Sequence, residues 1–225
     1  MKDLWNEMLT NRYLGEPEVN NLDFLNLLGV TLGKQPILLK NLYLSYIRKE
    51  RNFAHKPMIG AALSFEFDYL EQVVRISRGE ESALLYFYQF QKYMGLIDLL
   101  FSEVYPIGTV VELDKTLVPQ EIQEMYSQAE EGLLVTIHGR RIVTEKENEY
   151  IDYLASIWPF GIMDEVDPIY LNPIMIKRVV SMGLTNDTEK IFVIEVLRKQ
   201  LLSKGIYSYL YNGPTIDLNQ EVKSN

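Results

Sequence analysis

Residues 133–137 of this 225-residue chain read Leu-Leu-Val-Thr-Ile, an apolar run rich in β-branched side chains. Gly132 precedes the run and Gly139 follows it closely, and a short apolar run between such breakers is typical of a β-strand inside a sheet. Strand patterns also occur on either side of it, over 108–113, 150–158 and 179–182. Each of these lies beside a proline or glycine turn, so this half of the chain predicts a small, mainly antiparallel sheet.

Other features interrupt and close this strand pattern. Gly139 with the two following arginines interrupts or bulges the strand that begins at 133, and we expect Arg140 to face outward from it. Pro173 can open a single helical turn, and Asn186 with its neighbours can cap a closing helix over 187–202. The apolar residues of that helix fit one stripe, formed by Ile191, Ile194, Val196, Leu197 and Leu201.

The first half of the chain has a different period and reads as helical. Apolar residues recur at helical spacing over 3–14, 22–28, 36–51, 59–77 and 80–101. Asn21 suits an N-cap, Pro36 suits a first helical turn, and the 22–28 helix is expected to end at Gly29 or shortly after.

These patterns predict an α+β fold, in which a helical N-terminal half precedes a small mainly antiparallel sheet with a closing helix. We divide the chain into a helical region over 1–103, an α+β domain over 104–205 and a C-terminal tail over 206–225.

The predicted helix over 80–101 carries two apolar faces. The broad face is formed by Tyr86, Phe87, Phe90, Tyr93, Met94, Ile97 and Phe101, and the narrow one by Leu84, Tyr88 and Leu99. Such a helix either lies inside a bundle or packs one face on its own core and the other on a partner. The sequence does not decide which stripe faces the core. On the second interpretation the partner-binding residues are Tyr86, Phe90, Tyr93, Ile97 and Phe101, since aromatic side chains are common in interfaces.

Composition excludes several functional classes. The chain holds 31 acidic and 22 basic residues, a net charge of −9, and most of the excess, −7, belongs to residues 105–225. This charge argues against nucleic-acid or anionic-membrane binding. The absence of cysteine excludes disulfides, thiol nucleophiles and cysteine-based metal sites. No apolar run approaches the roughly 20 residues that span a bilayer, and no secretory signal opens the chain, so we expect no membrane insertion and a cytoplasmic location.

The sequence contains no recognised catalytic or cofactor-binding motif. His55 and His138 are the only histidines, and neither lies in a hydrolase motif. No glycine-rich phosphate loop is present. The acidic run from Asp164 to Asp167 resembles a solvated turn more than an acid/base pair or a calcium loop. We therefore expect no catalytic, cofactor-binding or metal-binding residues, no cofactor, and a protein that is not an enzyme.

An ordered series of strands and turns resembles a known family. The series comprises 105–111 (Tyr-Pro-Ile-Gly-Thr-Val-Val), 133–140 ending in Gly-Arg, 150–161 closing in Trp-Pro-Phe-Gly, and 170–184 from Tyr-Leu-Asn to Gly-Leu. It resembles a bacterial family of unknown function that is encoded beside LXG-type toxins in type VII secretion loci of Gram-positive bacteria. The resemblance covers about residues 103–200. Two departures are the insertion Thr116–Glu131 and Trp158, where the family often has tyrosine.

The resemblance implies an accessory protein for a secreted LXG-type toxin. We expect a cytoplasmic chaperone or targeting adaptor that binds the toxin or its helical partner. One alternative is an immunity protein that neutralises the cognate toxin, which the acidic charge favours if that toxin is basic. Another alternative is a small carboxylate-dependent enzyme that uses the Asp164–Asp167 region.

Overall fold

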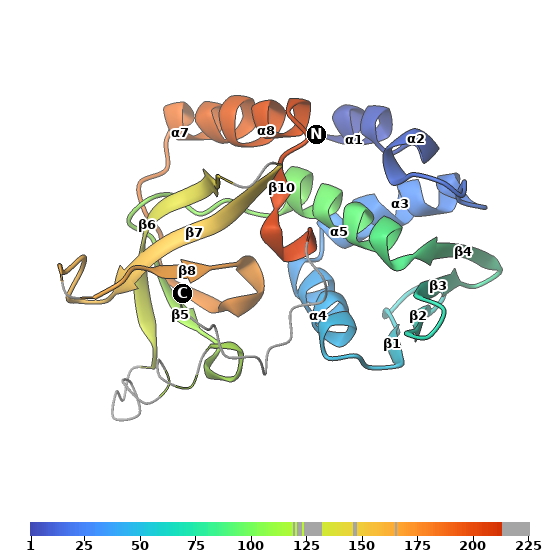
Figure 1. The fold of residues 1–225 in the computed structure, drawn as a ribbon, viewed down its shortest axis with the longest axis horizontal. Coiled ribbons are helices and arrows are strands. Elements are labelled where there is room, and N and C mark those ends of the chain that lie inside the picture. The colour runs from blue at the N-terminus through green and yellow to red at the C-terminus, as the bar shows by residue number, and fades with distance from the viewer. Residues whose placement is uncertain (119, 121–122, 124–131, 146–147, 165, 213–225) are drawn as a thin grey trace. The chain divides into compact units, whose positions relative to one another are not determined.

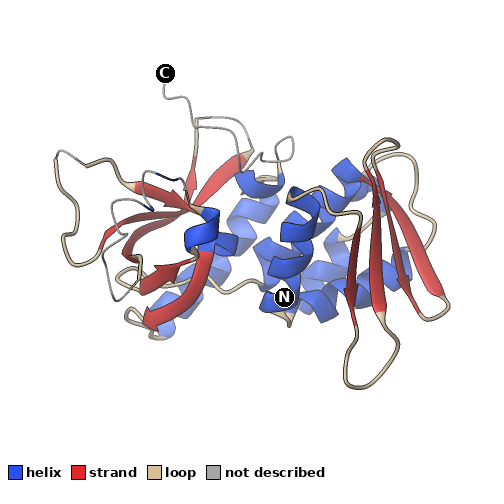
Figure 2. Cartoon of the chain, turned by 90° about the horizontal axis from the view of Figure 1, so that it is seen from below, coloured by secondary structure: helices blue, strands red, loops and turns tan. Residues whose placement is uncertain are grey.

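The computed structural model describes residues 1–118, 120, 123, 132–145, 148–164 and 166–212. The chain divides into two compact units: the first comprises Met1–Ser102 with Tyr211 and Asn212, and the second comprises Glu103–Leu210. Each unit contains helices and a sheet (Figure 1; Figure 2), so the predicted α+β class is confirmed. Residues 213–225 of the predicted tail lie outside the described residues. Within the described ranges, no helix has the length and apolar character needed to cross a membrane.

The helices of the first unit are α1 (Lys2–Met8), α2 (Asn11–Leu14), α3 (Leu22–Gly33), α4 (Pro36–Ile47) and α5 (Phe87–Phe101). Two of them, α3 and α4, begin where the sequence predicted a capping asparagine and a first-turn proline. The Asn21 side chain accepts a hydrogen bond from the Phe24 amide and caps α3. Pro36 occupies the first turn of α4, where its missing N–H has no partner to lose.

The predicted helix over 59–77 is wrong, because this region forms a sheet. Its strands are β1 (Asn52–His55), β2 (Leu63–Asp68), β3 (Val73–Arg78) and β4 (Glu81–Tyr86), antiparallel in the order β1-β2-β3-β4. Along β2 the side chains alternate strictly, with Leu63, Phe65 and Phe67 buried. This period of two places one face on the core, and Figure 2 shows the helices lying against one face of this sheet. The predicted helix over 80–101 consequently begins only at Phe87.

The core of the first unit is aromatic and centres on α5. The Phe90 ring lies 5.2 Å from that of Tyr46 on α4 and 6.3 Å from that of Phe65 on β2. Trp5 of α1 is fully buried, 5.9 Å from the Tyr93 ring. Helix α5 therefore joins the helical layer to the sheet.

The second unit is built on the predicted mainly antiparallel sheet. Its strands are β5 (Val110–Leu113), β6 (Leu134–Val143), β7 (Glu149–Ile157), β8 (Ile169–Leu171), β9 (Ile176–Ser181) and β10 (Tyr207–Ser208). The order is β10-β7-β6-β5-β9, with β8 also on β7, and only the β10–β7 pair is parallel. The register of β6 shifts between Ile137 and Gly139, where the sequence predicted an interruption. The short 3-10 turns are η1 (Lys115–Leu117), η2 (Pro173–Met175) and η4 (Tyr209–Tyr211).

The closing helix runs through α7 (Asp187–Phe192), the π-helical segment η3 (Val193–Gln200) and α8 (Leu201–Ser203). The outward orientation expected for Arg140 is wrong. Its guanidinium pairs with Glu189 of α7, with Nη2 2.7 Å from Oε2, and also lies over the Phe192 ring. Arg141 is buried as well and donates to the Leu197 carbonyl at 2.6 Å. Both arginines therefore attach the closing helix to the sheet.

Candidate protein-binding site

The five residues predicted to bind a partner do not form one exposed surface. Phe90, Tyr93 and Ile97 are fully buried, and the Tyr93 hydroxyl donates to the Leu25 carbonyl at 2.7 Å. Phe101 is half-buried with its ring 5.6 Å from that of Trp5. Tyr86 alone is exposed, at 38 %. The broad apolar face of α5 is therefore the face that packs on the core.

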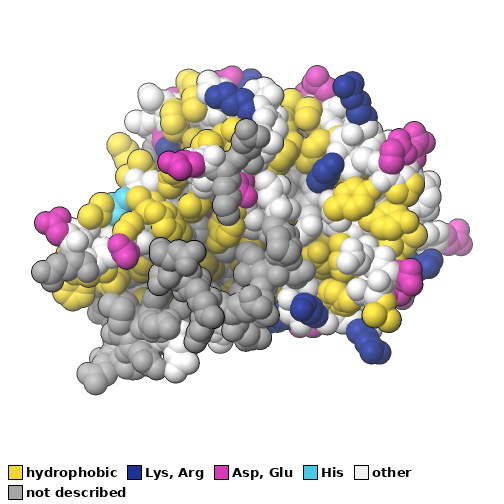
Figure 3. Space-filling view, in the orientation of Figure 1, with side chains coloured by type: hydrophobic (Ala, Val, Ile, Leu, Met, Phe, Trp, Pro, Cys, Tyr) yellow, Lys and Arg dark blue, Asp and Glu magenta, His cyan; other side chains and the backbone are white. Residues whose placement is uncertain are grey.

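The narrow stripe is divided between core and surface. Leu99 is buried, whereas Tyr88 is exposed and stacks on Tyr86 with ring centroids 6.0 Å apart. Leu84 belongs to β4 and is also exposed. Exposed apolar side chains occur elsewhere too. Figure 3 shows hydrophobic atoms at the surface of both units. Exposure alone therefore does not identify a binding site.

The residues considered for catalysis are placed without a catalytic arrangement. Asp164 and Asp167 are exposed, and the described residues contain no group of three His, Cys, Asp or Glu side chains suited to a metal ion. The sequence did not predict the pairing of His138 with Ser156, where Nε2 lies 2.6 Å from Oγ across β6 and β7. Among the described residues no hydrogen bond joins a carboxylate to His138, the contact by which the third group of a hydrolase triad orients its base.

The first unit contains a groove of about 460 Å³ between the first turn of α4 and strand β1. We call it the edge-strand groove. It is lined by Gln35, Pro36, Ile37, Leu38, Asn41, Phe53, Ala54 and His55. The lining is predominantly apolar, and Ile37 is 75 % exposed. A volume of this size accommodates large side chains of a bound chain.

Local sequence explains this groove. Pro36 starts α4 beside the strand, and the Gln35 side chain makes no capping bond to the helix. Phe53 is half-buried on β1, and its ring lies 6.2 Å from that of Phe65 on β2. The sequence pattern did not predict this groove, because it indicated no strand over 52–55.

The strand beside the groove has an unpaired edge. The Phe67 amide donates to the Arg51 carbonyl at 2.8 Å, and the pairing continues in register through Asn52 and Ala54. Backbone groups alternate in direction along an antiparallel strand, so those of Asn52 and Ala54 point away from β2. Within the described residues no strand pairs with this edge.

The opposite edge of the same sheet is partly covered. The Leu84 amide of β4 donates to Asn20 Oδ1 at 2.9 Å, and Asn21 Nδ2 donates to Glu81 Oε2 at 2.7 Å. Asn20 thus occupies one backbone N–H of β4 and Asn21 binds a side chain of the same strand, and covering of this kind protects a sheet edge. The open edge of β1 is therefore a specific feature of one side of the sheet.

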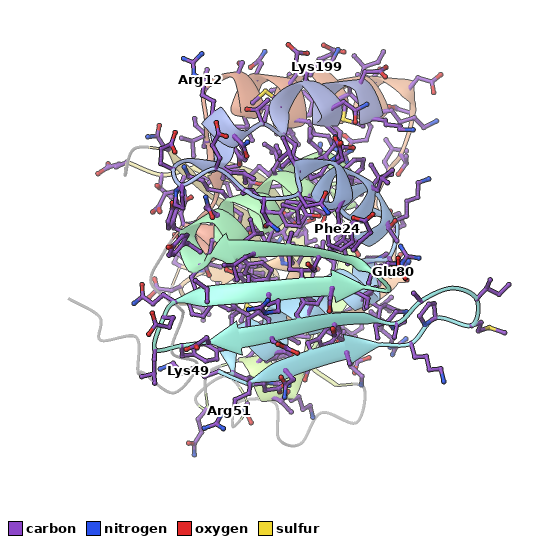
Figure 4. The ribbon with its side chains drawn as sticks, turned by 90° about the vertical axis from the view of Figure 1, so that its right-hand side faces the viewer. Arg12, Phe24, Lys49, Arg51, Glu80 and Lys199 are labelled. Carbon is purple, nitrogen blue, oxygen red and sulfur yellow. The ribbon has the colours of Figure 1, made fainter. Side chains whose placement is uncertain are left out.

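The stretch that forms α4 and β1 is basic. Residues 34–56 contain six Lys and Arg but only one acidic residue, Glu50, in a chain whose net charge is −9. Figure 4 shows Lys49 and Arg51 close together at one end of the sheet. Lys56, which directly follows β1 at its other end, is exposed, and so is Lys34, which directly precedes the groove residue Gln35.

One of three comparisons with known proteins gave a match, and that match lies in the second unit. Residues 104–192 match the model of a family described as Domain of unknown function (DUF4176). Comparison with curated proteins gave no match, and comparison with solved structures also gave none. The matched segment includes β5 to β9 and all of α7. The edge-strand groove lies outside the DUF4176 match.

The DUF4176 segment holds two carboxyl groups whose pKa is lowered by cations. Hydrogen bonds from Lys177 and Arg178 lower the pKa of Glu112, and the bond from Arg140 lowers that of Glu189. Lys177 Nζ lies 2.6 Å from Glu112 Oε1, and Arg178 Nε lies 2.5 Å from Oε2. A carboxyl group held ionised by ion pairs suits structure more than proton transfer. These ion pairs therefore contribute to the cohesion of the second unit.

Proposed function

We propose that this chain is a non-enzymatic accessory protein that binds a protein partner through the edge-strand groove. The observation that carries this proposal is the combination of an apolar groove with an unpaired strand edge. A peptide chain uses both features at once, since its backbone pairs with the edge while its side chains enter the groove. A small reactant would use the groove alone, and His55 is the one ionisable side chain among the described residues that line it.

The partner we propose is a secreted LXG-type toxin of a type VII secretion locus, held in the cytoplasm before export. Support comes from the match of residues 104–192 to a domain of unknown function and from the strand and turn series that resembles proteins encoded beside such toxins. In this role the chain acts as a chaperone or targeting adaptor for the toxin or its helical partner.

Co-expression of the full chain with the LXG protein encoded beside it, followed by size exclusion, tests this function. We expect the two proteins to elute together. Ile37→Glu places a charge in the groove and is expected to weaken the complex by about tenfold or more. Leu70→Glu is the control, because Leu70 is 94 % exposed in the β2–β3 turn and does not line the groove.

Failure of the toxin to co-elute would overturn the proposed function. Equal effects of the two variants would show that the toxin does not bind at the groove. The region bound separates two roles. Binding to the N-terminal LXG region supports a chaperone. Binding only to the C-terminal toxin region with loss of toxicity supports an immunity protein, which the charge of −7 over residues 105–225 favours if the toxin is basic.

A further inference from the structure

We propose that the edge-strand groove captures an extended segment of its partner that is apolar in the middle and acidic at its ends, and that this segment adds to β1 as a fifth strand. The proposal rests on the proposed function in that the segment belongs to a protein partner. It adds the conformation and the chemistry of what is bound.

The backbone of β1 supplies the pairing groups. Asn52 and Ala54 each direct one N–H and one C=O away from β2, as the register of the β1–β2 ladder requires. β1 is four residues long, so it matches a segment of about four residues, or about 13 Å. The captured segment is therefore short.

The groove selects the side chains. Phe53 and His55 pair with Phe65 and Leu63, both buried, so these four side chains share the face of the sheet that is turned to the helices. An added strand places every second side chain on that same face, next to Ile37 of α4. We therefore expect apolar residues at alternate positions of the segment.

The basic side chains near β1 determine which residues we expect at the two ends of the captured segment. Lys49 and Arg51 lie before β1, Lys56 directly follows it at its other end, and Lys34 directly precedes the groove residue Gln35. All four side chains are exposed, and none forms an ion pair among the described residues. Cations at both ends of an apolar groove complement acidic residues on both flanks of an apolar strand.

The test uses the full chain and labelled synthetic peptides in fluorescence anisotropy. The probe is Glu-Glu-Ile-Thr-Ile-Glu-Glu. One comparison peptide has lysine at every glutamate position, and another carries N-methyl groups on the central backbone. We expect the probe to bind, and each comparison peptide to bind about tenfold more weakly or worse. Raising the salt concentration from about 50 to about 300 mM is expected to lower the affinity of the chain for the probe, since salt screens the exposed charges.

Charge reversal on the protein provides a matched pair of variants. Arg51→Glu is expected to lower the affinity for the probe by about tenfold, which corresponds to about 1.4 kcal/mol of binding free energy. Arg12→Glu makes the same charge change, and Figure 4 shows Arg12 far from Arg51, beyond the opposite edge of the sheet. This control is expected to leave the probe's affinity unchanged. Both side chains are exposed, so melting temperatures should stay the same.

Strand addition itself is read from hydrogen exchange. The amides of Asn52 and Ala54 are expected to gain protection when the probe binds, because they become hydrogen-bonded. Equal binding of the acidic and basic peptides, no binding at millimolar concentration, or unchanged exchange at these two amides would overturn the inference. A dimer of the chain through β1 that the probe does not displace would also overturn it.

The outcomes separate this inference from the proposed function. If the toxin co-elutes but the probe does not bind, the inference fails and the function stands. If the probe binds as expected but no toxin co-elutes, the strand-capture site stands and the toxin is not its partner.

Discussion

At the scale of single residues, Gly29 shows how a glycine is used for packing. The sequence predicted that the helix ends at Gly29 or shortly after, and α3 continues to Gly33. A Cβ atom at position 29 would lie 2.1 Å from Cζ2 of Trp5, so only glycine lets this ring pack against α3. The Trp5 Nε1 group also donates to the Asn26 carbonyl at 3.2 Å. A contact between residues 24 positions apart leaves no periodic signal in the sequence.

Gly29→Ala is expected to destabilise the first unit. Alanine favours a helix over glycine by about 1 kcal/mol, but the clash with Trp5 forces the ring to move, and overpacking costs about 1–3 kcal/mol. Urea unfolding should therefore show a lower midpoint. In a Trp5→Ala background the clash is absent, so adding Gly29→Ala should leave stability unchanged or raise it. A fall of the same size in both backgrounds would contradict the packing argument.

At the scale of elements, the strands β1 to β4 explain where sequence reasoning failed. Phe65, Tyr69, Val73 and Ile76 recur at helical spacing, but Phe65 and Phe67 also satisfy a period of two. The β2–β3 turn contains no glycine, proline or asparagine, so the usual turn signal is missing. Asp68 makes the turn instead, and its Oδ1 accepts from the amides of Leu70 and Glu71. That aspartate was the available clue.

The error at the level of elements also concealed the site. The α+β class and the second sheet were predicted, because short apolar runs between glycines and prolines mark strands directly. The edge-strand groove requires β1 and α4 to lie side by side, which is a property of tertiary structure. Arg140 was misplaced for a similar reason, since its partner Glu189 lies 49 positions away.

The Arg140–Glu189 pair yields a prediction about the closing helix. The side chains are only 7 % and 17 % exposed. Arg140→Met leaves Glu189 without its partner, and breaking a buried pair costs about 3–5 kcal/mol, so we expect about 3 kcal/mol at pH 7, because Glu189 keeps some contact with solvent. Lys190→Met, which removes an exposed pair on the same helix, should have little effect. Chemical denaturation of the three proteins measures this difference.

The same pair predicts a pH dependence with a definite sign. Arg140 lowers the pKa of Glu189 in the folded chain below its ordinary value of 4.5. The stabilisation that ionised Glu189 gives the folded chain is therefore complete above that ordinary value. It is lost as the pH falls through the lower pKa that Glu189 has in the folded chain. The free energy of unfolding, measured from neutral to acidic pH, should fall less steeply for Arg140→Met than for the unchanged chain. Parallel curves would contradict the assignment, since Glu112 contributes equally to both proteins.

At the scale of the whole molecule, the chain returns to its first unit after completing the second. Tyr211 belongs to the first unit, is only 5 % exposed, and lies 4.6 Å from Tyr43 between ring centroids. A Cβ atom at Gly95 of α5 would lie 3.2 Å from Tyr211 Cβ, so the glycine allows close approach there. The core of the first unit is therefore completed by a residue more than 100 positions after Ser102.

This return predicts that Tyr211→Ala weakens the first unit selectively. Truncating a buried aromatic side chain costs about 3–5 kcal/mol, whereas Tyr211→Phe keeps the ring and should cost much less. Hydrogen exchange followed by mass spectrometry is expected to show faster exchange in α4 and α5 of Tyr211→Ala. Exchange in β5 to β9 should stay unchanged, because each unit has its own core and opens with its own free energy. If protection falls equally in both units, they unfold as one cooperative body, and the loss of Tyr211 would then destabilise the DUF4176 segment as much as the groove.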